Sequence, residues 1–157
     1  MEEKILVALD DSPSARRTVE FMTRILTPDQ KNIVLFSVVP DMAALCDMNS
    51  PELTPYFLSQ NYNLMEIKEQ KRRALLSVLE TAKNVLTESG FEEGQLQIKI
   101  QDKKRGIARD IIDEACSGYT LVVMGRRGLS GVEEFLLGSV SQKVLHTVKD
   151  ISVLIVN

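Results

Sequence analysis

Leu121-Val122-Val123-Met124-Gly125-Arg126-Arg127-Gly128, followed after nine intervening residues by Gly138-Ser139, joins an apolar run to an amphipathic segment. The three glycines lack the side chains that would keep a backbone away from phosphate oxygens. Ser139 can begin a helix whose free N–H groups attract anions. Two interpretations remain open, because glycines at such positions also form ordinary turns after a buried strand.

Working outward from this stretch, the chain alternates short apolar runs with amphipathic segments. Four continuous apolar runs predict strands, the first of them buried on both faces, and one alternating run predicts a partly exposed edge strand. The predicted strands are residues 4–9, 32–39, 95–101 (the alternating run), 121–124 and 151–156. Residues 41–63 lose all periodicity and contain Pro51 and Pro55, so we expect a long connection there whose role the sequence does not assign.

Four helices are predicted between these strands. Ser12 is placed as the N-cap of the first helix, with Pro13 at its first position, and Gly90 ends the longest helix. The predicted helices are residues 13–26, 64–89, 107–115 and 139–148. The alternation predicts a single α/β domain over residues 1–157: an open, Rossmann-like parallel sheet of order 3-2-1-4-5 with helices on both faces.

Composition excludes several classes of protein. The chain has 157 residues, 44% hydrophobic and 26% charged, with a net charge of −3. A net acidic balance argues against a nucleic-acid-binding protein. The apolar runs are of strand length and no signal peptide precedes them, so we predict a cytoplasmic protein without a membrane partner. Cys46 and Cys116 lack the spacing of a zinc or redox motif.

The topology predicts where a ligand binds. In the order 3-2-1-4-5 the first and fourth strands are neighbours, so Asp10 and Gly125 meet at the switch point of the sheet. A carboxylate there can accept hydrogen bonds from ribose, and the glycine stretch can bind phosphates. Arg126 and Arg127 either add positive charge to this site or are simply solvated side chains of the loop. No P-loop or G-x-G-x-x-G pattern is present, and His146, the single histidine, is expected on the surface.

The spacing glycine, two residues, glycine, nine residues, glycine-serine resembles that of the universal stress protein family, in its nucleotide-binding subgroup. Val-Val-Met-Gly and Leu-Leu-Gly-Ser-Val on either side also match, and the resemblance covers essentially the whole chain. It implies that Asp10 binds ribose, that Ala8 and Val38 line an adenine pocket, and that the glycine stretch holds phosphates. The full set of predicted nucleotide-binding residues is Ala8, Asp10, Val38, Gly125, Arg127, Gly128, Gly138, Ser139, Val140 and Ser141.

The resemblance also implies a ligand and a partner. The ligand would be ATP, with AMP and ADP as alternatives, accompanied by magnesium or manganese. The partner would be a second copy of the chain, joined through the C-terminal strand Val153–Val156, which would otherwise be an exposed edge. We expect a regulatory ATP-binding protein with slow hydrolysis at most.

Some features depart from the family pattern or support another function. Asp11 stands where glycine is frequent, and its carboxylate would either weaken ATP binding or help to hold a divalent cation. The cluster Lys103-Lys104-Arg105 is also unusual. A solvated run of charges is the simpler explanation, and we assign it no function. Alternatives to the main hypothesis are a phosphorylation receiver, suggested by Asp10-Asp11 although Asp102 is a poor phosphoacceptor, and a slow ATP-using enzyme.

Overall fold

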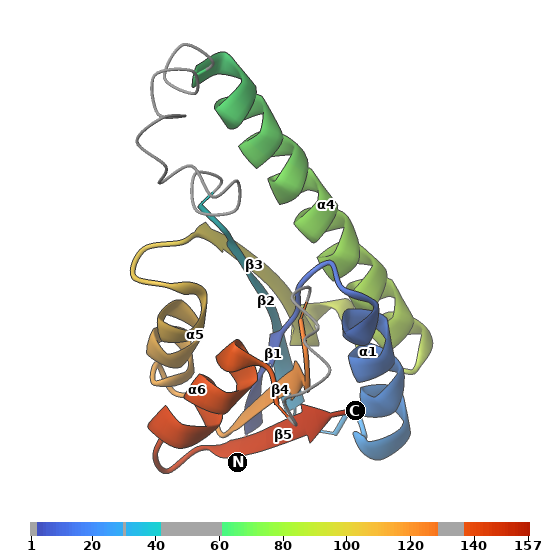
Figure 1. Cartoon of the computed structure of the whole chain (residues 1–157). Coiled ribbons are helices and arrows are strands. Elements are labelled where there is room, and N and C mark those ends of the chain that lie inside the picture. Colours follow the sequence, from blue (N-terminus) through green and yellow to red (C-terminus); the bar gives the residue numbers. More distant parts are fainter. Residues whose placement is uncertain (1–2, 30, 42–60, 129–136) are drawn as a thin grey trace.

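The computed structural model describes residues 3–29, 31–41, 61–128 and 137–157, which form one parallel sheet with helices on both faces (Figure 1). The strands lie in the order β3-β2-β1-β4-β5 and confirm the predicted fold class. Their bounds are β1 Glu3–Ala8, β2 Lys31–Val39, β3 Leu96–Asp102, β4 Leu121–Gly125 and β5 Ser152–Val156. This order differs from the 2-1-3-4-5 order of flavodoxin-like receivers, so the fold contradicts the receiver alternative.

Strand β1 is central because it is apolar on both faces. Ile5 pairs with Ile33 of β2 on one side and with Leu121 of β4 on the other. Ile5 and Val7 belong to one hydrophobic core and Leu6 belongs to the other, and all three are buried. The continuous apolar run therefore serves two cores, as expected for a strand in the middle of a parallel sheet.

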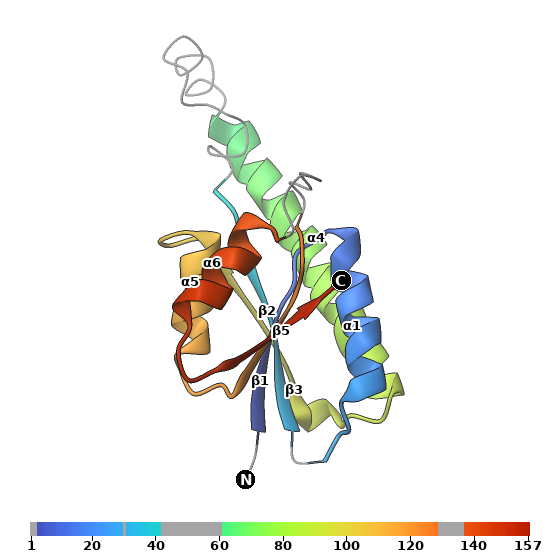
Figure 2. The ribbon, with the colours of Figure 1, turned by 60° about the horizontal axis from the view of Figure 1, so that its bottom comes forward.

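The helices divide between the two faces of the sheet. α1 and α4 cover one face, and α5 and α6 cover the other (Figure 2). Their bounds are α1 Pro13–Ile25, α4 Asn61–Glu88, α5 Ile107–Ala115 and α6 Ser139–Thr147. Leu79 and Leu86 of α4 are fully buried, and the burial of each stabilises the fold by roughly 1.5–3 kcal/mol. No helix in the described ranges is long and apolar enough to cross a membrane.

Helix α4 extends past the carboxyl edge of the sheet (Figure 1). It begins at Asn61, earlier than the predicted Leu64. Met65, in its projecting part, is 76% exposed. Because residues 65–67 of this part are exposed, hydrophobic periodicity carries no information about where the helix begins. The rest of the connection predicted for residues 41–63 lies, apart from Asp41, outside the described residues.

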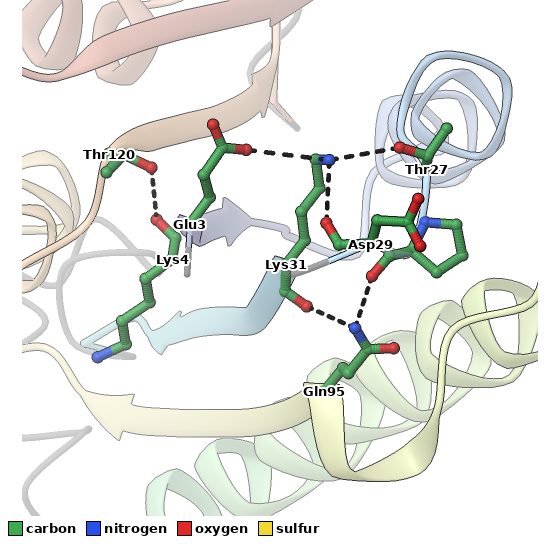
Figure 3. Close-up of polar contacts among 8 residues, drawn as sticks. Glu3, Lys4, Thr27, Asp29, Lys31, Gln95 and Thr120 are labelled. Carbon is green, nitrogen blue, oxygen red and sulfur yellow. Dashed lines mark hydrogen bonds and ion pairs between the residues drawn. The ribbon is translucent and has the colours of Figure 1, made fainter. Parts of the chain in front are cut away.

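The amino ends of β1, β2 and β3 are linked by polar side chains (Figure 3). Gln95 Nε2 donates hydrogen bonds to Pro28 O at 2.7 Å and Lys31 O at 3.0 Å. Gln95 ends a short 3₁₀ helix, η1 (Glu93–Gln95), so the predicted start of the third strand at Gln95 is wrong by one residue. Gln95 Oε1 also accepts a hydrogen bond from Glu92 N at 2.9 Å, and a side chain that bonds back to its own turn competes with the sheet for that residue.

Candidate functional site

A cavity of about 320 Å³ lies at the carboxyl ends of β1, β2 and β4. It is the position at which an open parallel sheet leaves a crevice between helices of opposite faces. All ten predicted nucleotide-binding residues line it, namely Ala8, Asp10, Val38, Gly125, Arg127, Gly128, Gly138, Ser139, Val140 and Ser141. The fold thus brings the predicted residues of three strands and one helix together in one cavity.

Asp10 is fixed at the turn that follows β1. Its Oδ1 accepts a 3.0 Å hydrogen bond from Ser12 N and a second from Ser12 Oγ. Ser12 occupies the predicted N-cap position of α1, but its side chain makes no capping bond to the helix because it is held by Asp10. The other oxygen, Oδ2, faces Gly128, where a Cβ atom would lie only 2.7 Å away. Asp10 therefore presents one oriented oxygen beside the glycine loop.

Two of the loop glycines lie at close contacts with other parts of the chain. A Cβ atom at Gly125 would lie 2.7 Å from Ser14 Oγ and 3.4 Å from Thr18 Oγ1 of α1. A Cβ atom at Gly138 would lie 3.3 Å from Arg126 O. A side chain at position 125 would therefore clash with α1, and one at position 138 would be tight against the backbone of the loop.

Hydrogen bonds from side chains fix the path of the loop. Ser14 Oγ donates to Arg127 O at 2.7 Å, and Ser141 Oγ donates to Gly125 O at 2.9 Å and to Arg126 O at 3.0 Å. Three successive loop carbonyls are thereby satisfied. Helix α6 begins next to them, with Gly138 as its N-cap and no side-chain cap. The first N–H groups of such a helix lack intrahelical acceptors and attract anions.

Another part of the cavity lining is apolar. Val38 and Phe36 of β2, Met124 of β4 and Ile107 and Ile111 of α5 line it. Burial of flat apolar surface against such side chains is favourable, whereas the glycine loop and the α6 N-terminus favour negative charge. The arrangement therefore suits a molecule that combines a planar apolar group with an anionic group.

Lys71 of α4 also lines the cavity, and the sequence did not predict it. Its Nζ donates hydrogen bonds to both carboxylate oxygens of Asp11, at 2.7 and 2.6 Å. The exposed fractions of the two side chains are 18% and 23%. A signal was present in the helix, because Lys71 lies one turn before buried Leu75 on the stripe that faces the sheet.

The described residues do not offer a protein site for a divalent metal. No group of three or more His, Cys, Asp or Glu side chains in the described ranges is arranged to hold an ion. Both oxygens of Asp11 are engaged by Lys71, so the carboxylate does not fit the role of metal ligand that the sequence left open. Among the described residues, the carboxylate of Asp11 is not available to a magnesium or manganese ion while it is paired with Lys71.

Other residues singled out in the sequence lie away from the cavity. Buried Asp110 accepts backbone hydrogen bonds from Lys104 at 2.7 Å and from Arg105 at 3.0 Å, so the basic cluster forms an ordered turn before α5. Arg105 is exposed and pairs with Asp113. His146 is exposed, as predicted. Cys46 and the aromatic residues of the 41–63 connection lie outside the part whose side chains are described.

One ionisable cluster lies outside the cavity, between β3 and α5. Lys99 Nζ donates to Glu114 Oε2 at 2.6 Å, and Tyr119 OH donates to Oε1 at 2.7 Å. Burial favours a higher pKa for Glu114, but the hydrogen bonds from Lys99 and Tyr119 and the charges of Lys99 and Lys4 outweigh it, and the pKa is lowered. Burial and the bond to Glu114 raise the pKa of Tyr119.

Comparison with known proteins gives one consistent family. The model of the Universal stress protein family matches residues 1–157. The chain is 27% identical over 145 residues to Universal stress protein YxiE of Bacillus subtilis, covering 92% of each chain. It is 30% identical over 158 aligned residues to Universal stress protein Sll1388 of Synechocystis sp., covering 98% of this chain and 96% of that relative.

Solved structures share the fold at lower identity. Universal stress protein UspA from Lactobacillus plantarum has a TM-score of 0.74 and 22% identity, covering 99% of this chain and 98% of the other. A universal stress protein in complex with cAMP has a TM-score of 0.58 and 20% identity, with 99% and 97% covered. The protein from Archaeoglobus fulgidus in complex with dAMP has a TM-score of 0.60 and 16% identity, with both chains fully covered.

Proposed function

Because this chain belongs to the universal stress protein family, we propose that it is a regulatory protein that binds an adenine nucleotide, ATP above all, in the cavity at the ends of β1 and β4. One observation carries the proposal. The lining of one cavity contains an apolar part at Val38, the glycine loop, the N-terminus of α6 and the oriented carboxylate of Asp10. These are the surfaces that a base, phosphates and a ribose need.

The proposed pose follows from these surfaces. Adenine would lie against Ala8 and Val38, ribose hydroxyls would donate to Asp10, and phosphates would accept hydrogen bonds from the loop and the first turn of α6. The solved relatives with cAMP and dAMP support adenine nucleotides as the ligand class. We favour ATP over ADP or AMP because the glycine spacing resembles that of the ATP-binding family members.

We propose binding rather than rapid turnover. The described lining of the cavity contains no histidine or cysteine, and its lysine is paired with Asp11. Fast phosphoryl transfer uses a phosphate-reaching lysine and a general base. Here the lysine is engaged by Asp11, and the proposed pose assigns the carboxylate of Asp10 to the ribose. Magnesium or manganese would enter with the nucleotide on its phosphate oxygens.

We also propose that the chain forms a homodimer through the edge of β5. In the described sheet β5 pairs with β4 on one side only. Val153, Leu154 and Ile155 are each half-buried in the isolated chain. An apolar edge strand of this kind is stabilised by pairing with a second copy. Nucleotide occupancy at the nearby end of β4 would then be coupled to the shape of the dimer.

The test is mass spectrometry of nucleotides extracted from freshly purified protein, with calorimetry of added ATP. We expect bound adenine nucleotide in the wild type and its loss in Gly128→Asp and Gly138→Asp, whose carboxylates repel phosphate in the loop. Gly94→Asp is the matched control, because no atom lies within 4 Å of a Cβ placed there. Nucleotide retained equally by all three variants would refute the proposed site.

A further inference from the structure

The Lys71–Asp11 pair is the feature of the cavity that the proposed function does not use. Both Asp11 oxygens accept hydrogen bonds from the ammonium group, at 2.7 and 2.6 Å. The pair is far less exposed than its neighbour on α4, Lys68–Asp102, whose side chains are 42% and 48% exposed. An ion pair with little access to solvent is weakly screened, so its charges act strongly on a ligand beside it.

The charge balance of the cavity depends on this pair. Its lining holds the carboxylates of Asp10 and Asp11 and the cations of Lys71 and Arg127. Asp11 would repel the phosphates of a bound nucleotide if its charge were uncompensated, since like charges a few ångströms apart oppose each other. Lys71 supplies that compensation from within the chain.

A divalent cation is the usual alternative means of compensation. Magnesium prefers oxygen ligands and is commonly held by one or two carboxylates together with substrate phosphates. In this chain the ammonium group of Lys71 engages both oxygens of Asp11. Resting on the proposed function, we infer that Lys71 takes the place of a protein-bound divalent cation, so that the chain binds its nucleotide equally well with and without magnesium.

Removal of Lys71 should expose this role. Lys71→Met keeps the length and helix propensity of the side chain but leaves Asp11 unpaired. Without metal, repulsion by Asp11 should weaken ATP binding by about tenfold or more. With magnesium, the freed carboxylate and the phosphate oxygens form an oxygen set suited to the ion, and most of the affinity should return.

The measurement is the dissociation constant of ATP in excess EDTA divided by that in saturating magnesium chloride, from calorimetry. We expect a ratio within about threefold of one for the wild type and about ten or more for Lys71→Met. In Lys71→Met/Asp11→Asn the ratio should return towards one, because the unpaired charge is gone. Lys68→Met, an equivalent change one turn away at a lysine outside the cavity, should keep the wild-type ratio, and thermal melts report folding of every variant.

Three results would overturn the inference. A wild type that loses ATP in EDTA needs the metal that Lys71 is inferred to replace. A wild-type ratio in Lys71→Met means that the pair does not control metal dependence. Weak binding by the double variant in both buffers means that Lys71 contacts the phosphates directly. Absence of ATP binding by the wild type in both buffers is a different failure, because it refutes the proposed function itself.

Discussion

Substitution of Gly125 by alanine tests the close contact between β4 and α1 on which the glycine loop depends. The new Cβ atom would lie 2.7 Å from Ser14 Oγ, 3.2 Å from Ser14 Cβ and 3.4 Å from Thr18 Oγ1. Ser14 cannot turn aside without loss, because its hydroxyl donates to Arg127 O at 2.7 Å and lies 2.8 Å from Ser12 Oγ. The substitution must therefore either separate the strand from the helix or break a buried hydrogen bond.

The expected loss of stability follows from overpacking and from the lost hydrogen bond. Overpacking of a closely packed site costs about 1–3 kcal/mol, and loss of a buried hydrogen bond adds about 0.5–1.5 kcal/mol. In a chain of 157 residues each kcal/mol lowers the melting temperature by about 2–4 °C. We therefore expect Gly125→Ala to melt about 3–18 °C below the wild type in the absence of nucleotide.

Thermal melts followed by circular dichroism and urea titrations measure the effect. Gly94→Ala is the matched control, since its Cβ has no neighbour within 4 Å, and it should be neutral or slightly stabilising. In Gly125→Ala/Ser14→Ala the nearest atom, Ser14 Oγ, is absent, so the two changes should be less than additive. A Gly125→Ala melting temperature within about 1 °C of the wild type would refute the close contact.

Two further predictions concern acid stability and assembly. Glu114 has a lowered pKa in the folded state, so the stability it contributes is complete above its ordinary value of 4.5 and is lost as the pH falls through the lower folded value. Glu114→Gln should lower the free energy of unfolding at pH 7 by about 1–2 kcal/mol and make that free energy fall less steeply as the pH is lowered. Urea titrations at several pH values measure it, and a pH dependence parallel to that of the wild type would contradict the prediction. Ser152 N bonds to Thr120 O, so by strand alternation the N–H of Ile155 points away from β4. Ile155→Pro should then yield monomers in sedimentation experiments while Ile155→Val stays dimeric, and an unchanged dimer would exclude this edge as the interface.

The sequence predicted the sheet well because each strand carries its own signal. Continuous apolar runs at β1 and β4 require burial on both faces, and the alternating run at β3 requires an edge position, which is where β3 lies. The placement of Asp10 beside the glycine loop then followed from topology alone. The cavity lining contains every residue that was predicted for the site.

What the sequence did not predict depends on contacts between distant residues. The start of α4 at Asn61 lies in a projecting segment without a buried stripe. The capping role of Ser12 is lost to a hydrogen bond with Asp10, a competition that spacing does not reveal. The partner of Asp11 is 60 residues away, and only the packing of α4 on the sheet decides which of its polar side chains reaches the cavity.

That packing explains why Lys71 and not a neighbour reaches Asp11. Leu75 and Leu79 are buried, and they fix the rotation of α4 about its axis. Since residues four apart share a helix face, Lys71, one turn before Leu75, lies on the side of α4 that faces the cavity. Lys68, one turn nearer the start of α4, and Arg72 pair instead with Asp102 at the end of β3. The compensation of Asp11 is therefore set by the hydrophobic core, and a shift of α4 by one residue would leave a carboxylate unpaired in the cavity.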